Sequence, residues 1–467
     1  MRDSKETARQ VVCGGQLALF FFAFLQSELL FDNAMVPLVG ERGVILAQAA
    51  ILATSAIGFV LYPVLAQAAR RAGHATGAAR AVALAAAPAG TLLLTLALRL
   101  EDAKPAIALG CLSFLLLGLG GARAHRLAVW ARAEKHAGAM AGLSYAGGLL
   151  LQFAANAAPM PDEWFGMPVV AAAVAGCLLG HRLDGHKAEE GEAAPKAASP
   201  QARRNGLSPT VTTVLLVGLM TCIFSTLDNI VTVAHAGGDI NVVASPRLVL
   251  AASGAVAGLL FDACGRRAAA LATFCSALAA TIVLLIAQSG GSMALALVIF
   301  YVSAGVFATF FTSEFLHLAG SSSHPDLWAG MGRGENNLVA AIFALPSLAL
   351  MDTGDAVLIM AVALGLICLT AVAAALHMRA LGEKDLPAAE PTPAPSLEER
   401  TAAIAAAHGL TPRETDVLLA VVSDEKTLAA TADDLGISLR MVQRHLTSIY
   451  KKTGTSSRAG LVRLTSR

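Results

Sequence analysis

The chain has 467 residues, of which 56% are hydrophobic and only 14% are charged. Soluble globular domains carry roughly 25% charged residues, so this composition excludes a water-soluble protein of this length. The formal net charge of +1 identifies no class of partner, and only the distribution of charges along the chain can do so.

Twelve apolar segments predict a polytopic membrane bundle. Runs of about 18 or more apolar residues are typical of helices that cross a bilayer. The segments are 11–31, 44–66, 79–98, 105–121, 136–157, 166–181, 210–234, 246–263, 268–287, 292–316, 328–350 and 355–377. The first has the layout of a signal peptide, but it is too long for a cleaved one and further spans follow. We therefore predict about twelve transmembrane helices, with the first one retained.

The charges between these segments indicate the topology. If the N-terminus is cytoplasmic, the outer loops hold Glu41, Arg42, Arg99, Glu101, Asp102, Lys104, Asp162, Glu163, Asp239, Asp352 and Asp355. The inner segments hold Arg70, Arg71, Arg123, Arg126, Arg132, Lys135, Lys187, Lys196, Arg203, Arg204, Arg266, Arg267, Arg379 and Lys384. Lys and Arg thus gather inside, as the positive-inside rule requires. We predict a multi-pass protein of the cytoplasmic (inner) membrane with both termini cytoplasmic.

An internal repeat divides the apolar part into two six-helix halves. Asp32-Asn33 and Asp228-Asn229 lie 196 residues apart, and so do Arg70-Arg71 and Arg266-Arg267. The alternative is chance matching in Ala-rich helices. The repeat predicts halves at 1–180 and 210–378, joined by a cytoplasmic central loop at 181–209. Two parallel six-helix repeats are the plan of one large class of transporters.

A loop motif in the second half supports this plan. It contains Gly258, Asp262, Gly265 and Arg266-Arg267. Glycines let two helix ends approach closely, and Asp262 can cap the N-terminus of a neighbouring helix. The motif resembles the GxxxDxxGRR loop of the major facilitator superfamily, which implies that fold. The first half keeps only Arg70-Arg71, with Tyr62, Ala66 and Ala69 at the other aligned positions, so transport activity is left open.

Polar residues inside the spans are candidates for a ligand pocket or gate. An ionisable residue at the centre of a span costs about 2.5–3.5 kcal/mol, so it often marks a function. The candidates are Glu28, Asp32, Asp228, Glu314, Arg333, Glu335, Asn336 and Asn337. Arg333 and Asn337 share a helix face, and Glu314 is a possible partner for Arg333. The alternatives are solvated helix ends for the first three residues and an internal salt bridge for the block near Arg333.

The sequence contains no catalytic or metal-binding motif. It lacks a P-loop, HExxH, GxSxG, histidine-kinase or receiver motif, so we expect no enzyme. The cysteines lie singly in apolar stretches, which favours small packing residues over a disulfide framework or zinc site. They are Cys13, Cys111, Cys177, Cys222, Cys264, Cys275 and Cys368. We accordingly expect no cofactor and no metal.

A Pro-rich linker at 379–395 leads into a predicted soluble domain at 396–467. The linker contains Pro387, Pro391, Pro393 and Pro395, which make it semi-rigid. A helix begins at Ser396 with Glu399 completing a capping box, and it ends near Gly409.

The remaining residues predict a helix-turn-helix. Thr411 and Glu414 form a second capping box, and its helix turns Val417, Leu418, Val421 and Val422 to a core. Thr427 caps a short helix, Gly436 makes the turn, and Ser438 caps a third helix to about Lys452. The inward face of that helix is predicted to hold Met441, Val442, His445, Leu446 and Ile449. The other face holds Arg440, Gln443, Arg444, Thr447, Lys451 and Lys452. From Ser438 to Arg467 there are seven Lys or Arg residues and no acidic residue, whereas Asp424, Glu425, Asp433 and Asp434 precede this helix.

These residues resemble the LuxR-type (NarL/FixJ-like) DNA-binding domain. The resemblance covers about 58 residues and is carried by Leu410 to Glu414, Leu435 to Ser438, Val442, His445, Ile449, Lys452 and Arg458. It implies that Gln443, Arg444 and Thr447 reach base edges and that Lys451 and Lys452 contact phosphates. It also implies a fourth helix, Arg458 to Leu464, through which two domains pair. Thr453 and the small residues Ala429 to Thr431 depart from the family pattern.

The fold class predicted from the sequence is therefore all-α: a polytopic, major-facilitator-like bundle followed by a four-helix LuxR-type domain. We predict a bacterial, membrane-embedded, one-component transcription regulator whose bundle senses an unknown small-molecule ligand. Its other partners are the lipid bilayer and double-stranded promoter DNA, bound as a homodimer of the C-terminal domain. The alternatives are a transporter with a fused regulatory DNA-binding domain and a regulator whose bundle is only an anchor.

Overall fold

The structure is a computed structural model. It describes residues 2–71, 76–131, 136–158, 161, 164–190, 207–238, 240–242, 245–288, 290–385, 396–423 and 426–465. Several charges used to predict the topology lie outside these residues: Arg132, Lys135, Asp162, Glu163, Lys196, Arg203, Arg204 and Asp239. The same holds for the four linker prolines, Asp424, Glu425, Arg467 and the side chains of Arg70, Arg71, Lys187 and Lys384.

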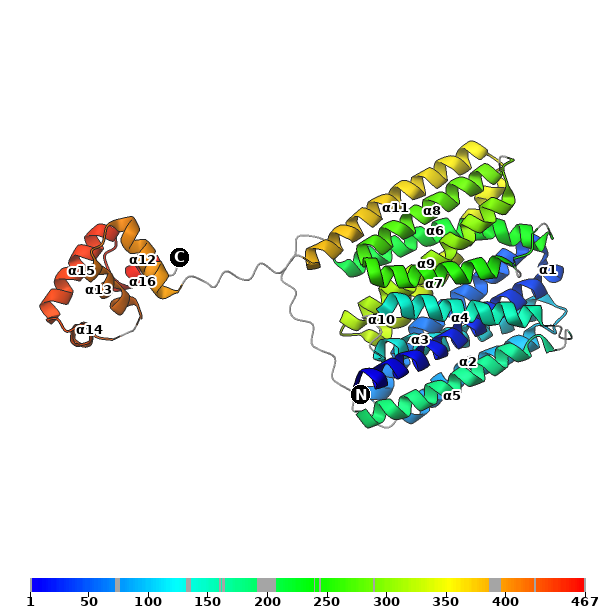
Figure 1. Ribbon diagram of the computed structural model, residues 1–467, viewed down its shortest axis with the longest axis horizontal. Helices are drawn as coiled ribbons and strands as arrows, with labels where there is room; N and C mark the ends of the chain where they lie inside the picture. Colours follow the sequence, from blue (N-terminus) through cyan, green and yellow to red (C-terminus); the bar gives the residue numbers. More distant parts are fainter. Residues whose placement is uncertain are drawn as a thin grey trace. The chain divides into compact units, whose positions relative to one another are not determined.

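The chain forms two compact units, Met1–Glu383 and Lys384–Arg467. The first unit is a bundle of long helices, and the second contains five shorter ones (Figure 1). Every element found in the described residues is helical, which confirms the predicted all-α fold class.

The bundle contains eleven helices among its described residues. They are α1 (Arg2–Arg71), α2 (Thr76–Ala97), α3 (Ala103–Trp130), α4 (Ala137–Ala157), α5 (Met167–Glu190), α6 (Pro209–Ala236), α7 (Ser245–Cys264), α8 (Arg266–Gln288), α9 (Met293–Ser321), α10 (Pro325–Asp352) and α11 (Ala356–Asp385).

The first helix carries two of the predicted spans. A straight helix of 70 residues would be about 105 Å long, far more than a bilayer needs. The backbone leaves the helical region at Gly40, where φ is 75° and ψ is 171°. Gln48 donates hydrogen bonds to Glu28 and Asp32, so the segments before and after Gly40 lie side by side. A left-handed φ favours glycine, which explains why the chain turns there.

The twelve predicted spans all fall on helices. Where a predicted span extends beyond its helix, it does so by one or two residues at most. Nine of the described helices, α1 counted once, are long and apolar enough to cross a membrane. The apolar parts of α2 and α5, Leu84–Ala97 and Met167–Leu183, are shorter. The first helix begins and α11 ends at the same end of the bundle, as an even number of crossings requires (Figure 1). We call this the terminal end, and the opposite one the far end.

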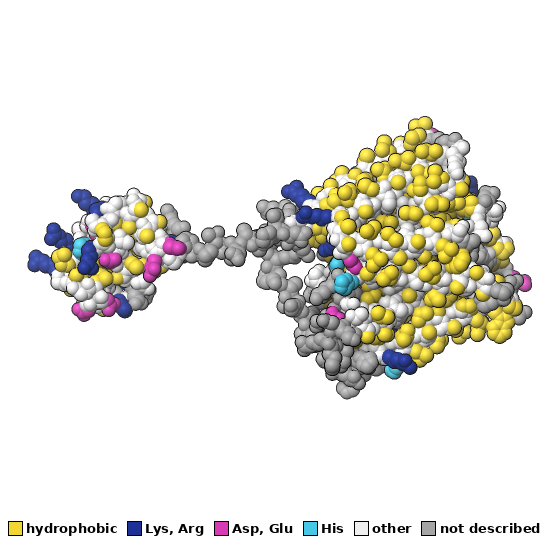
Figure 2. Space-filling view, viewed as in Figure 1, with side chains coloured by type: hydrophobic (Ala, Val, Ile, Leu, Met, Phe, Trp, Pro, Cys, Tyr) yellow, Lys and Arg dark blue, Asp and Glu magenta, His cyan; other side chains and the backbone are white. Residues whose placement is uncertain are grey.

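The outside of the bundle is apolar. Large side chains such as Leu178, Ile342 and Val357 are more than half exposed, and apolar residues cover most of the visible side of the bundle (Figure 2). An apolar surface of this extent in water would drive association, so it fits the hydrocarbon of a bilayer. Aromatic side chains, including Phe21, Phe24 and Phe311, pack in the interior.

A close helix crossing joins the first and second halves of the sequence. Gly138 and Gly142 of α4 face Gly254 and Gly258 of α7, and a Cβ on Gly138 or Gly142 would collide with the α7 backbone. Small residues at matching positions let two membrane helices approach closely. The Asp262 carboxylate accepts 2.8 Å hydrogen bonds from the backbone N–H groups of Gly138 and Ala139. The cap predicted for Asp262 is thereby confirmed.

The C-terminal unit contains α12 (Leu397–His408), α13 (Pro412–Ser423), α14 (Leu428–Asp434), α15 (Leu439–Thr453) and α16 (Arg458–Thr465). The predicted caps at Ser396, Thr427 and Ser438 and the capping box of Thr411 with Glu414 are confirmed. The core includes Val417, Leu418, Val421, Val442, Leu446, Ile449 and Leu461. Met441 is 40% exposed, so its predicted inward position is wrong. Its place beside Val442 on the helix turns it away from the core, and His445 is only half-buried.

Candidate functional site

The outer face of α15 presents a row of basic and polar side chains. Arg440, Gln443, Arg444, Thr447 and Lys451 are all exposed. Lys and Arg side chains gather along this part of the unit (Figure 2). No hydrogen bond or ion pair joins Arg440, Arg444 or Lys451 to another described residue, so their donors face solvent. A cationic helix of this kind suits the phosphates and base edges of a DNA groove.

Lys452 is used differently from its neighbour Lys451. The sequence predicts a phosphate contact for it, whereas its ammonium donates to Glu414 at 2.7 Å and to the carbonyl oxygen of Gly409 at 3.0 Å. The lysine therefore fastens α15 to the start of α13, and its phosphate contact stays a prediction. Its side chain is 33% exposed, against 6% for that of Glu414.

Glu414 is the centre of this attachment. Its carboxylate accepts hydrogen bonds from Lys452, from the Ser448 hydroxyl at 2.6 Å and from the backbone N–H of Thr411 at 2.7 Å. These donors stabilise the ionised form and lower the pKa of Glu414 to about 2. The sequence predicted only its capping role, because Ser448 and Lys452 lie more than thirty residues away.

Arg458 attaches α16 to the rest of the unit. Its guanidinium donates to the carbonyl oxygen of Val421 at 3.0 Å and to that of Lys426 at 2.6 Å. The side chain thus joins the start of α16 to the end of α13. The helices α15 and α16 are thus both held in fixed positions by polar contacts with α13 or with the residues that follow it.

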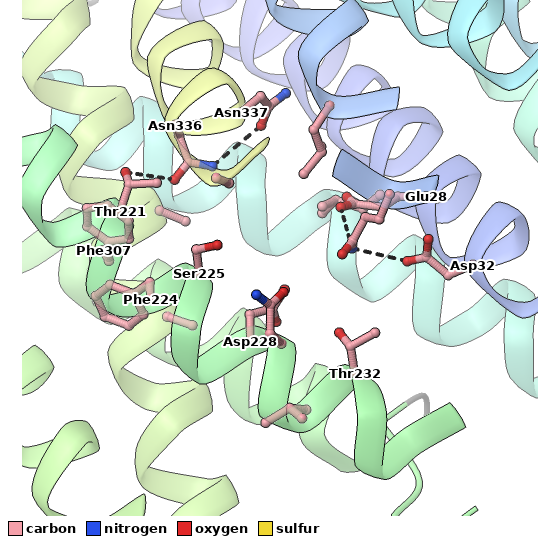
Figure 3. Close-up of a pocket in the computed structure, with 18 of the residues that line it drawn as sticks. Glu28, Asp32, Thr221, Phe224, Ser225, Asp228, Thr232, Phe307, Asn336 and Asn337 are labelled. Atoms are coloured by element: carbon pink, nitrogen blue, oxygen red, sulfur yellow. Dashed lines mark hydrogen bonds between the residues drawn. The ribbon is translucent and has the colours of Figure 1, made fainter. Parts of the chain in front are cut away.

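The bundle contains a polar cavity with a volume of about 230 Å³. Six of the eight candidate pocket residues line it: Glu28, Asp32, Asp228, Arg333, Asn336 and Asn337. They come from α1, α6 and α10, as Figure 3 shows for all except Arg333. Aromatic side chains, including Phe224 and Phe307, form part of the wall (Figure 3). The sequence placed these residues inside spans, and the fold brings them around one space.

Hydrogen bonds fix several of the cavity's polar groups. Gln48 donates to Glu28 and to Asp32, both at 3.1 Å, and so holds the two carboxylates together (Figure 3). Asn337 donates to Ser55 at 2.8 Å, which joins α10 to α1. Thr221 of α6 donates to Asn336 at 3.3 Å. The three helices that supply the candidate residues are thus linked directly through side chains.

Arg333 is a buried cation beside three aromatic rings. Arg333 is 8% exposed, and its guanidinium carbon lies 5.2–5.8 Å from the ring centres of Phe21, Phe24 and Phe311. Aromatic faces attract a cation, but they accept no ordinary hydrogen bond. The Nε and Nη2 atoms are buried and have no hydrogen-bond partner among the described residues. Arg333 therefore has unused donor capacity at the cavity.

Glu314 and Glu335 do not line the cavity. The possible pairing of Glu314 with Arg333 is wrong, because Glu314 accepts hydrogen bonds from Arg266, one of them at 2.9 Å, and lies 3.4 Å from His377. Glu314 projects toward α8 and α11, away from α10. Glu335 lies on another side of α10 from Arg333, near Gly218 of α6.

Ionic contacts close the terminal end of the bundle. Arg126 of α3 pairs with Asp326 of α10, and Arg266 of α8 pairs with Glu314 of α9. His377 of α11 also contacts Thr212 of α6 at 3.2 Å. Together with the Asp262 cap, these contacts join helices from both halves of the sequence. The cavity residues Glu28 and Asp32 of α1 and Asp228 of α6 lie nearer the far end.

Sequence reasoning missed several residues of the cavity. Gln48, Arg247, Tyr145 and Tyr301 all line it. A single polar or aromatic residue in an apolar helix gives no periodic signal, so only the fold reveals these positions. No cluster of three or more metal-ligating side chains occurs within the described ranges.

Comparisons with known proteins support the division into two units. Residues 408–465 match the family described as bacterial regulatory proteins, luxR family. The bundle resembles the crystal structure of the human organic anion transporter MFSD10 (TETRAN), with 14% identity, a TM-score of 0.55, and coverage of 80% of this chain and 99% of that one. At this identity the likeness shows the fold alone: the bundle shares the helical fold of that structure.

Two further solved structures resemble the bundle with lower TM-scores. An auto-inhibited POT-family peptide transporter matches at 13% identity and a TM-score of 0.49, over 81% of this chain and 97% of that one. A bacterial homologue of the iron transporter ferroportin, in an outward-facing state, matches at 10% identity and 0.47, over 80% and 99%. None of the curated proteins matches the chain.

Proposed function

We propose that the chain is a membrane-embedded, one-component transcription regulator: a small molecule binds in the bundle cavity and changes how the C-terminal unit binds promoter DNA. One observation carries the proposal. The same chain has a cavity with a buried Arg333, two of whose nitrogens have no hydrogen-bond partner among the described residues, and a LuxR-type domain whose α15 exposes Arg440 and Arg444. The first feature suits ligand binding and the second suits DNA binding.

In the proposed orientation, the terminal end of the bundle lies on the cytoplasmic side of a bacterial inner membrane. Arg126, Arg266 and Arg267 lie at that end, whereas Asp352 and Asp355 lie at the far end. Positive residues favour the cytoplasmic side of a membrane. This orientation directs the chain after α11 toward the compartment that contains DNA. We further propose that two C-terminal units bind as a homodimer through α16.

A route from the cavity to the linker runs through α11. His377 of α11 is buried against Glu314, and the Gly382 backbone lies so close to the Arg267 guanidinium that a Cβ there would collide with it. Arg267 of α8 and Asp262 of α7, which caps α4, flank the loop between these two helices. Any rearrangement of that loop would therefore move the last turns of α11, from which the chain continues through 386–395 into α12.

The direction of control follows from ligand affinity. A ligand can shift a conformational equilibrium only by the difference between its affinities for the two states. The described state has a closed terminal end and a cavity displaced toward the far end. A ligand that fits this cavity would favour this state, and its loss would favour a state in which the α4–α7 and α3–α10 contacts open.

A reporter experiment tests this proposal. Expression from the promoter that the protein occupies is measured against a panel of small molecules, in cells with wild-type protein or with Arg333→Ala. The wild type should respond and the variant should not, while both occupy the promoter. Arg99→Ala is the matched control, because Arg99 is an exposed arginine of the far end outside the cavity lining. If no molecule changes expression although the wild type occupies its promoter, the sensing role is wrong.

The second candidate function is transport with a fused regulatory domain. The major-facilitator-like fold and a cavity lined by both halves of the sequence favour it. A transporter moves the bound molecule across the membrane, whereas a sensor only binds it. Reconstituted protein that moves the bound molecule across vesicles, with a rate that Arg333→Ala abolishes, would support transport, whereas binding without flux would support sensing.

A further inference from the structure

The charges around the cavity define the kind of molecule it suits. The lining contains three carboxylates, Glu28, Asp32 and Asp228, and two guanidiniums, Arg247 and Arg333. No ion pair within 4 Å joins any of these five groups among the described residues. Buried charges that form no ion pair are costly, so the cavity holds both acceptors and donors that lack a partner of opposite charge.

Arg333 lies at a different depth from the three carboxylates. Arg333 lies eight residues from Pro325 at the start of α10, about 12 Å from the terminal end of that helix. Asp228 lies eight residues from Ala236 at the end of α6, about 12 Å from the far end of that helix. Glu28 and Asp32 are four residues apart on α1 and are held together by Gln48. Arg247 lies two residues from the start of α7, near the far end like the carboxylates. The inner part of the cavity thus holds Arg333, and the outer part holds three carboxylates and one guanidinium and stays acidic in balance.

Several residues of the cavity have buried polar atoms without a hydrogen-bond partner among the described residues, which points to ligand binding. The Nε and Nη2 atoms of Arg333 are buried without a hydrogen-bond partner in the described part of the chain, and Arg333 is more than nine-tenths buried. Asn229 is 4% exposed and also lines the cavity. Its buried Nδ2 atom likewise has no hydrogen-bond partner in the described part of the chain. One Asp32 oxygen is likewise buried without a donor.

We propose that the cavity binds a small bipolar molecule, with a carboxylate at Arg333 and an ammonium group at the cluster of Glu28, Asp32 and Asp228. This inference rests on the proposed function and names its ligand class. An anion alone would add negative charge beside three carboxylates. A cation alone would leave the donors of Arg333 unpaired. A molecule that carries both groups satisfies the two ends of the cavity, and a volume of about 230 Å³ limits its size. A cavity of about 150 Å³ already accommodates benzene, so an aromatic or aliphatic body of similar size fits here.

Two matched sets of compounds test this proposal on the purified full chain in lipid nanodiscs. The first set is phenylalanine, phenethylamine and 3-phenylpropionate. The second is 5-aminopentanoate, pentylamine and pentanoate, in which the two charges are further apart. Affinity is measured by calorimetry and by the shift in thermal unfolding. In at least one set the bipolar compound should bind roughly tenfold to a hundredfold more tightly than both single-charge analogues, since a hydrogen bond to a charged group contributes about 1.5–3 kcal/mol.

Variants assign the two ends. Arg333→Gln should abolish the advantage of the bipolar compound over the amine, and Asp228→Asn should reduce its advantage over the acid. Arg99→Gln and Asp102→Asn are controls outside the cavity, and Asn replaces Asp equally well as the N-cap of α3. If neither bipolar compound binds more tightly than its analogues, the proposal is wrong. Bipolar binding without any change in expression would instead contradict the regulatory function and leave the ligand class standing.

Discussion

Two polar sites in the chain are built in opposite ways. Around Glu414, each carboxylate oxygen has donors within the C-terminal unit, and Lys452, Ser448 and Thr411 supply them. Around Arg333, two donor nitrogens are buried and have no hydrogen-bond partner in the described residues. Satisfied polar groups stabilise a fold, whereas unsatisfied buried groups cost stability and are kept where they serve another purpose. The comparison separates residues that hold the protein together from residues that bind something else.

The largest expected effect concerns groups on α15 that face solvent. The double substitution Gln443→Ala with Arg444→Ala should weaken binding to the specific operator. The expected loss is roughly tenfold to a hundredfold, or about 1–3 kcal/mol, for each side chain that no longer reaches a base edge. Electrophoretic mobility shifts at fixed salt measure this. Arg99→Ala removes an equal charge from the bundle and should change nothing. Undiminished specific binding by the double variant would remove α15 from the DNA interface.

A substitution at Glu414 should destabilise the C-terminal unit. Glu414→Ala removes a helix cap and two side-chain hydrogen bonds, at a cost of about 3 kcal/mol. Hydrogen exchange of α13 and α15 in the full chain reports this free energy of opening. Asp416→Ala is the control on the same helix, because Asp416 is exposed and makes only a 3.8 Å contact with Arg413. Equal exchange in the two variants would mean that the Glu414 contacts do not stabilise the unit.

The same site should make the stability of the C-terminal unit depend on pH. Glu414 has a pKa of about 2 in the folded protein, below its ordinary value of 4.5. Its stabilising contribution is therefore complete above about 4.5 and is lost as the pH falls from there toward 2. Hydrogen exchange of α13, recorded across this range, should show a loss of protection that Glu414→Gln lacks. An identical pH dependence in the two proteins would exclude Glu414 as its source.

At Arg333 we expect the opposite effect of a substitution on stability. Replacing a buried charge that has no partner by an apolar side chain is often neutral or stabilising. Arg333→Met should therefore unfold at the same temperature as the wild type or a higher one, while it loses the response to ligand. Differential scanning fluorimetry in nanodiscs, without added ligand, measures this. A clear fall in the unfolding temperature would place Arg333 with Glu414 among the structural groups.

The smallest effect separates two adjacent lysines. Lys451→Ala should weaken binding to all DNA sequences alike and reduce the salt slope of the binding constant by about one. Lys452→Ala should leave the slope unchanged and increase hydrogen exchange in α15, because Lys452 pairs with Glu414. Equal slopes for the two variants would contradict this division of roles.

The sequence was sufficient where structure depends on near neighbours along the chain. The helices on which the twelve predicted spans fall follow from runs of apolar residues, and the caps at Ser396, Thr411 and Ser438 follow from side chains that bond three residues ahead. The Asp262 cap could also be predicted, because its motif resembles a known loop. Such signals lie within one helix or one turn.

Contacts between distant segments could not be predicted in the same way. Glu314 was expected near Arg333 from their depths in the membrane, yet Arg266 and His377 surround it because of how α8, α9 and α11 pack. Depth restricts one coordinate only, and the rotation of each helix decides the partner. The hydrogen bond between Lys452 and Glu414 could not be predicted for a similar reason, since the basic character of a lysine does not reveal which carboxylate lies within hydrogen-bond distance.

The most direct test of the account is the coupling between cavity and DNA. Full-length protein in nanodiscs is titrated with the bipolar compound that it binds most tightly, with and without saturating operator DNA. Because linkage is reciprocal, a ligand that changes the affinity for DNA must have its own affinity changed by the same factor. We predict such a change in the wild type and its absence when Gln443→Ala and Arg444→Ala prevent DNA binding. Equal ligand affinities with and without operator DNA would contradict control of the C-terminal unit by the cavity.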